Sequence, residues 1–374
     1  MSDSSSRSDR RHFLATACQV LGVCGISGLL LSHSAPQSQQ QPQQAGPLPQ
    51  HYDLKTAQAE FSRVESAGFS PRDAQFWEKA TSGLIRCTLC PIFCELRPYQ
   101  RGNCRVRFSL ENRLVTVVYG KPCSVAIDPI EKKPVFHLLP GTTAFSFATA
   151  GCLLGCRYCQ NWQISQAKPE DCEQRDLPPE LAVQAAISQG CRSIAYTYTE
   201  PTIFYEYMFD TARLAKEKGL RNVMVSCGYI NPEPLKQLLP LLDVMKVDLK
   251  GFTERFYQTI CGGTLAPVLS TLKQLSGSKA LVDIVTLVVP TLNDDPDTMK
   301  SMFQWIRTNL GPNVCLHLSR FFPTYQLRNL PHTPVEVLIQ LRESAMAEGL
   351  NYVYLGNVPG SGGENTYCPK CRKI

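Results

Sequence analysis

The sequence has no long block of Lys and Arg, although its formal net charge at pH 7 is +6. This modest basic excess, spread over 374 residues, argues weakly for anionic small ligands and against nucleic acid as a partner. The N-terminal apolar run, Ala15–Leu31, is interrupted by Gln19 and three glycines. Its length is borderline for crossing a bilayer, and these residues make it a poor spanning helix.

Cysteine, by contrast, is abundant, with 17 residues in the chain. Many lie two or three residues apart, and in a chain this large such spacing indicates metal ligands rather than a disulfide framework. Apolar residues make up 43% of the sequence, which fits a globular protein with a real core. The length fits one large domain plus a smaller one.

The N-terminus has the features of an export signal. Arg10 and Arg11 precede the apolar run, and Ser32-His-Ser34 places small residues where a peptidase could cut. This pattern predicts a Tat-type signal or anchor, with the body exported or tethered facing outward. The alternatives are a chance arginine pair before an uncleaved anchor, and a cytoplasmic enzyme.

Three cysteines, Cys152, Cys156 and Cys159, follow the apolar run Ala144–Ala150, which predicts a strand. We call them the cysteine triplet. An iron–sulfur cube normally takes four cysteine ligands, so a cube held by these three keeps one iron open, as catalytic metal sites do. The alternatives are a zinc site that recruits Cys172 or another distant ligand, and reduced core cysteines, because ligand spacing alone does not select the metal.

Four more cysteines precede this segment, and we call them the outer cysteines: Cys87, Cys90, Cys94 and Cys104. Their spacing predicts a second metal site. The C-terminal tail adds Cys368 and Cys371, a CxxC pair without a partner pair of its own. Two arrangements remain open: a zinc site that joins Cys87 and Cys90 to the tail pair, and a second iron–sulfur cluster held by the four outer cysteines.

From residue 144 onward, short apolar strands alternate with helical segments, which predicts an α/β fold with a parallel sheet and right-handed crossovers. Periodicity does not distinguish a closed barrel from an open doubly wound sheet. Strands are expected at Phe145–Thr149, Ser193–Tyr198, Asn222–Val225, Val244–Val247, Leu281–Val289, Val314–Leu318 and Tyr352–Leu355. Helices are expected at Pro179–Gln189, Thr202–Lys218, Pro234–Leu239, Leu265–Leu275, Asp297–Asn309 and Pro334–Glu348.

Catalytic groups in a parallel barrel lie at the carboxyl ends of strands, and several polar residues fall there. Glu200 ends the second strand, although a residue before proline could also cap the next helix. His317 lies in the sixth strand between two leucines, where a hydrogen-bonded core histidine is an alternative. The other candidates follow the third and fourth strands: Ser226, Asp248 and Lys250.

The triplet, with Tyr158 before its last cysteine, resembles the CxxxCxxC signature of radical S-adenosylmethionine (SAM) enzymes. Further motifs narrow the resemblance to the pyruvate formate-lyase activating-enzyme-like group, and most closely to the radical SAM member of the AmmeMemoRadiSam system. The resemblance runs from about Arg86 to the C-terminus. Its other motifs are Asp128–Pro134, Phe136-His137, Cys159–Trp162, Tyr196–Pro201, Asp248–Lys250 and Gly356–Pro359.

The resemblance implies a partial (β/α)6-type TIM barrel, a 4Fe-4S cluster on the triplet, and SAM bound to its open iron. It also implies stacking of Tyr158 on adenine, Glu200 at the amino group of SAM, and His317 near the adenosyl group. Ser226, Asp248 and Lys250 would complete the SAM site, with Lys250 at the carboxylate. Cys227 is a departure, because these relatives usually carry asparagine there.

We therefore expect five segments: a signal or anchor (1–34), a disordered Gln/Pro-rich linker (35–55), a cysteine-rich domain (56–141), a radical SAM core (142–358) and a CxxC tail (359–374). The expected activity is reductive cleavage of SAM to a 5'-deoxyadenosyl radical, which abstracts hydrogen from a protein or small-molecule substrate. An electron-transfer or metal-carrier protein without SAM chemistry is the alternative. Expected partners are a low-potential electron donor and Memo-like and AMMECR-like proteins.

Overall fold

The structure is a computed structural model that describes residues 52–371 and 373–374, which belong to one compact unit. The expected leader (1–34) and most of the expected linker (35–55) lie outside the described residues. The linker ends earlier than predicted, because helix α2 (Leu54–Ser66) begins inside it, capped by the Asp53 side chain. In the described part of the chain, no helix is long and apolar enough to cross a membrane.

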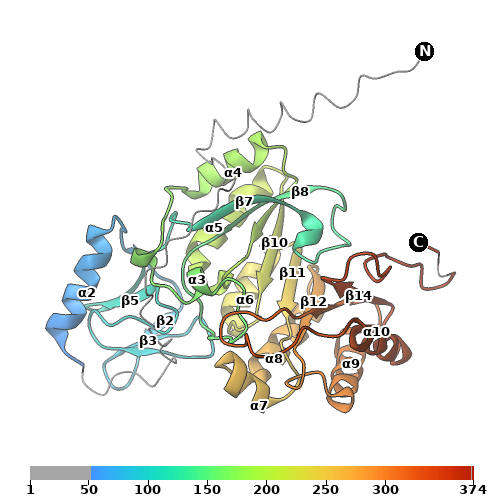
Figure 1. Cartoon of the computed structure of the whole chain (residues 1–374). Coiled ribbons are helices and arrows are strands. Elements are labelled where there is room, and N and C mark those ends of the chain that lie inside the picture. Colours follow the sequence, from blue (N-terminus) through green and yellow to red (C-terminus); the bar gives the residue numbers. More distant parts are fainter. Residues whose placement is uncertain (1–51, 372) are drawn as a thin grey trace, which may run out of the picture. The chain divides into compact units, whose positions relative to one another are not determined.

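An eight-stranded sheet forms the centre of the protein, and seven of its strands run parallel. The parallel strands occur in sequence order across the sheet, as the labelled strands β8, β10, β11, β12 and β14 show in Figure 1. A doubly wound sheet reverses its strand order partway, so this uninterrupted order excludes that alternative. The strands are β8 (Thr143–Ala148), β9 (Ser193–Tyr196), β10 (Arg221–Ser226), β11 (Val244–Asp248), β12 (Leu281–Val288), β13 (Cys315–Arg320) and β14 (Tyr352–Gly356).

Helices connect successive parallel strands, as the alternating pattern predicts. Three of the predicted helices are followed by a glycine with positive φ, Gly190, Gly219 and Gly349, which ends a helix without Cβ strain. The sequence places most helix and strand ends within two residues of the observed ones. The connecting helices are α3 (Trp162–Ser165), α4 (Pro179–Ser188), α5 (Tyr205–Glu217), α6 (Pro232–Leu238), α7 (Glu254–Phe256), α8 (Leu265–Ser276), α9 (Pro296–Leu310) and α10 (Val335–Ala347).

The eighth strand, β7 (Ser124–Pro129), pairs antiparallel with β8 along its whole length. It lies within the segment 56–141 that was expected to form a separate domain, so the boundary expected at residue 142 is wrong. The motif Asp128–Pro134 begins inside this strand. Its first two residues finish β7, and a short 3₁₀ helix (Ile130–Lys132) follows.

Two small antiparallel sheets precede the main sheet (Figure 1). One contains β1 (Arg72–Asp73), β5 (Arg107–Leu110) and β6 (Arg113–Thr116), and the other contains β2 (Trp77–Lys79), β3 (Ile85–Cys87) and β4 (Glu95–Leu96). Their apolar residues join the same buried core as those of the main sheet. This shared core is why the described residues form one unit.

Candidate functional site

A cavity of about 550 Å³ opens at the carboxyl ends of the parallel strands, where parallel α/β folds place their active sites. Its volume lies in the range of small-molecule sites. Seven of the nine predicted site residues of the core line it: Cys152, Cys156, Tyr158, Cys159, Glu200, Asp248 and Lys250.

The cysteine triplet lies on the loop that leaves β8, and close backbone contacts hold this loop. The amides of Gly155 and Arg157 donate to the carbonyls of Cys261 and Ile260, at 2.9 Å each. Gly151 has φ +97°, and a Cβ atom there would lie 2.4 Å from the Cys104 carbonyl oxygen. Only glycine therefore allows the loop to approach the outer cysteines this closely.

Hydrogen-bond donors surround the triplet sulfurs. The Leu154 amide lies 3.5 Å from Cys152 Sγ, and Ser165 Oγ lies 3.2 Å from Cys159 Sγ. A hydrogen bond from Cys261 lowers the pKa of Cys156 to about 7, whereas burial raises the pKa of Cys152. Three thiols on one cavity, with donors at their sulfurs, fit an iron–sulfur cluster, whose potential depends on such hydrogen bonds.

Glu200 is buried at the end of β9 and is 1% exposed. Its Oε1 accepts hydrogen bonds from the Thr202 amide (3.1 Å) and the Ser226 hydroxyl (2.7 Å), while its Oε2 accepts from the Cys227 amide (2.8 Å). The capping interpretation is confirmed, because Glu200 caps the 3₁₀ helix Pro201–Phe204. Glu200 also lines the cavity, so the two interpretations are compatible.

Lys246, Asp248 and Lys250 form a charged row at the end of β11. Asp248 accepts hydrogen bonds from both lysines, with Lys250 Nζ at 3.2 Å from Oδ2. Burial alone would raise the pKa of Asp248, but the two ammonium groups lower it. Burial likewise opposes a charged Lys250, yet Asp248 and nearby thiols raise its pKa. Sequence reasoning missed Lys246, although a lysine inside an apolar strand was a usable signal.

A second charged cluster lies at the rim of the cavity, at the end of β7 and in the segment that follows it. Asp128 is 4% exposed and accepts hydrogen bonds from Lys132 (2.7 Å), Lys133 and the Tyr198 hydroxyl. These three donors outweigh burial and lower the pKa of Asp128. Lys132, Lys133 and Tyr198 line the cavity. Their roles were not predicted, because only the fold brings residues 128 and 198 together.

Two predicted site residues lie outside the cavity lining. His317 is 1% exposed and stacks on Tyr354, with ring centroids 4.9 Å apart. Its Nε2 lies 3.6 Å from Asp283, and burial lowers its pKa. His317 is therefore buried like a core histidine, but its Nε2 has no hydrogen-bond partner in the described residues. Its expected place near the adenosyl group stays a prediction. Ser226 is buried behind Glu200 and acts on the cavity only through that carboxylate.

The four outer cysteines line a second, small cavity. Cys368 and Cys371 are exposed on the C-terminal tail, and Figure 1 places that tail at the opposite side of the protein from β2 and β3. The expected zinc site between Cys87, Cys90 and the tail is therefore corrected. Cys172 lines neither cavity, so nothing supports it as a ligand of the triplet.

No group of three or more His, Cys, Asp or Glu side chains in residues 52–371 is already gathered as the ligands of one metal ion. The ligands of a cube bind different iron atoms, so they need not converge on one point as the ligands of a single ion do. A single-ion site at the outer cysteines requires the sulfurs to move inward.

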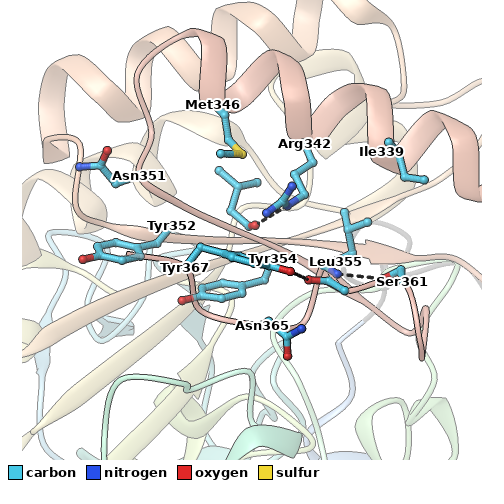
Figure 2. Close-up of a pocket in the computed structure, with 13 residues that line it drawn as sticks. Ile339, Arg342, Met346, Asn351, Tyr352, Tyr354, Leu355, Ser361, Asn365 and Tyr367 are labelled. Carbon is cyan, nitrogen blue, oxygen red and sulfur yellow. Dashed lines mark hydrogen bonds between the residues drawn. The ribbon is translucent and has the colours of Figure 1, made fainter. Parts of the chain in front are cut away.

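A further pocket of about 400 Å³ lies between α10, β14 and the C-terminal tail. Figure 2 shows Arg342, Tyr354 and Tyr367 at this pocket, with Arg342 donating to the Val353 carbonyl oxygen at 2.9 Å. None of the predicted site residues lines it. We therefore place the candidate active site in the cavity at the strand ends.

A family model for the radical SAM superfamily matches residues 147–304. The uncharacterized protein MJ0808 of Methanocaldococcus jannaschii is 47% identical over 300 residues, which cover 80% of this chain and 89% of that protein. The pyruvate formate-lyase-activating enzyme of Listeria monocytogenes is 23% identical over 173 residues (44% of this chain, 68% of that enzyme). The benzylsuccinate synthase activating enzyme of Thauera aromatica is 25% identical over 183 residues (44% and 54%).

Among solved structures, a radical SAM methyltransferase from Sphaerobacter thermophilus aligns with 77% of this chain and 76% of its own. The TM-score is 0.46 at 14% sequence identity.

Proposed function

Because the chain belongs to the radical SAM superfamily, we propose that it reductively cleaves SAM at a 4Fe-4S cluster held by Cys152, Cys156 and Cys159. The observation that carries the proposal is the convergence of these three thiols with Glu200 and Lys250 on one cavity. When bound, the cluster and SAM supply a 5'-deoxyadenosyl radical for hydrogen abstraction from the substrate.

Glu200 would bind the amino group of SAM. A carboxylate has about four acceptor sites, and Oε2 accepts only the Cys227 amide among the hydrogen bonds of Glu200. Its remaining capacity suits an ammonium group. The buried hydrogen bonds to Oε1 hold the carboxylate in place before the ligand arrives.

Lys246 and Lys250 would bind a carboxylate or another anionic group in the cavity. Each ammonium has three donors, and one donor of each is directed at Asp248. On the two neighbouring strands, Val225, Val285 and Leu287 supply apolar lining. This lining would keep water from a reactive radical.

The sheet order and the cavity also support a partial (β/α)6-type barrel, in which β7 and β14 remain unpaired with each other. An opening between these edge strands would admit a bulky substrate. The activating-enzyme relatives suggest hydrogen abstraction from a partner protein, and a small-molecule substrate is the second candidate.

A closed cluster in an electron-transfer protein is the competing function, and one observation favours it. Cys227 lines the same cavity as the triplet and could supply a fourth thiolate. We propose that it does not, because its amide anchors Glu200 beside the space that SAM would fill.

Anaerobic reconstitution with iron, sulfide, SAM and dithionite tests both functions. The wild type and Cys227→Ala should release 5'-deoxyadenosine, whereas Cys156→Ala should not. Loss of activity in Cys227→Ala together with loss of iron would support the closed cluster. Absence of 5'-deoxyadenosine from a fully iron-loaded wild type would refute SAM cleavage.

We further propose that the Arg10-Arg11 leader targets the protein to the Tat pathway, so that the body is exported or tethered facing outward. The leader lies outside the described residues, and its sequence alone supports this proposal. Fusion of residues 1–50 to a reporter that works only after Tat export should give a signal, and an Arg10→Lys, Arg11→Lys pair should abolish it. Absence of reporter signal from the fusion with the native leader would place the enzyme in the cytoplasm.

The proposed partners are a low-potential electron donor and Memo-like and AMMECR-like proteins, as the sequence resemblance implies. Co-purification from cells that express the candidate proteins together would test the two protein partners, with reduced flavodoxin or ferredoxin as candidate electron donors. Failure of both proteins to associate with the tagged chain, under anaerobic conditions and with SAM, would argue against them.

A further inference from the structure

We propose that the outer cysteines, Cys87, Cys90, Cys94 and Cys104, bind one structural zinc ion that supports the loop of the cysteine triplet. The four side chains line a single small cavity. They come from three short backbone segments: the end of β3, the turn that leads into β4, and the turn before β5.

Local backbone geometry brings the four cysteines to one cavity, although their sulfurs are not yet gathered around one point. The Cys87 amide donates to the Cys94 carbonyl oxygen at 2.9 Å, which closes the β3–β4 hairpin. Between them, the Phe93 amide donates to the Cys90 carbonyl oxygen, and Phe93 has φ +48°. Gly102 lies beside two of the cysteines: a Cβ atom there would be in ordinary van der Waals contact with Cys94 Sγ (3.8 Å) and Cys104 Sγ (3.9 Å), so both sulfurs lie close to this residue.

Arg107 brings a guanidinium group to the wall of the cavity. Its side chain lines the cavity and is 1% exposed, and its Nη1 lies 3.7 Å from Cys87 Sγ. Nη2 pairs with Glu206, while Nε is buried without a hydrogen-bond partner in the described residues. A buried guanidinium beside Cys87 is compatible with a site where thiolates carry net negative charge.

The small size of the cavity favours a single ion over a cluster. Its volume is about 20 Å³, which is room for about one water-sized body. A cube of four iron and four sulfide ions needs far more space. Four thiolates around one ion give the closed tetrahedral site typical of structural zinc, with no position left for a substrate.

The metal site would brace the active-site loop. Leu153, inside the triplet loop, lines the same small cavity as the outer cysteines. The Cys104 carbonyl lies against Gly151, and Arg105 Nη1 donates to the Cys152 carbonyl oxygen at 3.3 Å. Zinc binding would draw the four thiols inward, and the free energy of binding would add to the free energy of folding. It would therefore hold the backbone that positions Cys152.

Metal analysis of the purified protein tests the proposal. The wild type should contain about one zinc ion per chain, and Cys94→Ser should lose it. A Cys152→Ala, Cys156→Ala, Cys159→Ala triple variant should keep the zinc while losing the barrel iron, which separates this test from that of SAM cleavage. Cys191→Ala, a buried cysteine of the core, is the matched control and should change neither metal.

X-ray absorption spectroscopy at the zinc edge identifies the ligands of zinc in the wild type. It therefore tests the proposal even if Cys94→Ser does not fold. Four sulfur neighbours at about 2.3 Å would support the site. A wild type without zinc, a zinc ion bound by nitrogen or oxygen, or loss of a second set of iron atoms in Cys94→Ser would overturn it.

Discussion

Replacing Gly151 by alanine should destabilise the protein more than a positive φ alone accounts for. The residue has φ +97°, and an added Cβ would lie 2.4 Å from the Cys104 carbonyl oxygen, 3.1 Å from Val106 and 3.2 Å from Ile203. Left-handed strain costs about 1–2 kcal/mol, and overpacking costs about 1–3 kcal/mol more. We expect Gly151→Ala to lose about 2–5 kcal/mol of unfolding free energy.

Gly190→Ala is the matched control for this prediction. Gly190 has φ +68°, and a Cβ there meets no atom within 4 Å, so this variant should show the strain cost alone. Chemical denaturation of both variants under anaerobic, reducing conditions gives the comparison, and iron content after reconstitution reports on the triplet loop. Equal stability of the two variants would refute the close approach of Cys104 to the loop.

Three further predictions concern the cavity. Alanine at any triplet cysteine, for example Cys156, should abolish SAM cleavage and barrel iron while circular dichroism stays native, and undiminished cleavage would contradict the assignment. Lys250→Met should raise the KM for SAM at least tenfold with a smaller effect on kcat, whereas an unchanged KM would remove this lysine from the binding site. Asp128→Asn should cost about 3–5 kcal/mol at neutral pH because it leaves Lys133 buried without its charge partner. Because the folded-state pKa of Asp128 is lowered, the difference in unfolding free energy between the wild type and Asp128→Asn should be fully present above a pH of about 4 and shrink as the pH falls further. A difference that does not change with pH would contradict this prediction.

Local patterns in the sequence determined most of the secondary structure. The helix predicted at Asp297–Asn309 is observed at Pro296–Leu310, and the strand predicted at Val244–Val247 is observed at Val244–Asp248. Proline at helix starts and apolar runs in buried strands act through neighbouring residues. The missed strand β7 shows the limit of such signals, because its extended conformation depends on pairing with β8.

Some of the residues that line the cavity could also be predicted from the sequence. Cys152, Glu200 and Lys250 were found because each follows a predicted strand, and parallel strands bring their carboxyl ends to one edge. His317 misled this reasoning, since its place in the strand gives no information on whether its side chain points toward the cavity. In the structure the His317 ring is buried against Tyr354 and Asp283 and does not line the cavity.

The sequence by itself determined that two groups of cysteines exist, that one follows a strand, and that the chain alternates strands and helices. Only the tertiary structure decided which distant residues meet. It placed the outer cysteines in one cavity without Cys368 and Cys371, and it brought Asp128 to Tyr198. The physical reason is that spacing along the chain limits contacts only between near neighbours, whereas contacts across many residues depend on how the whole core packs.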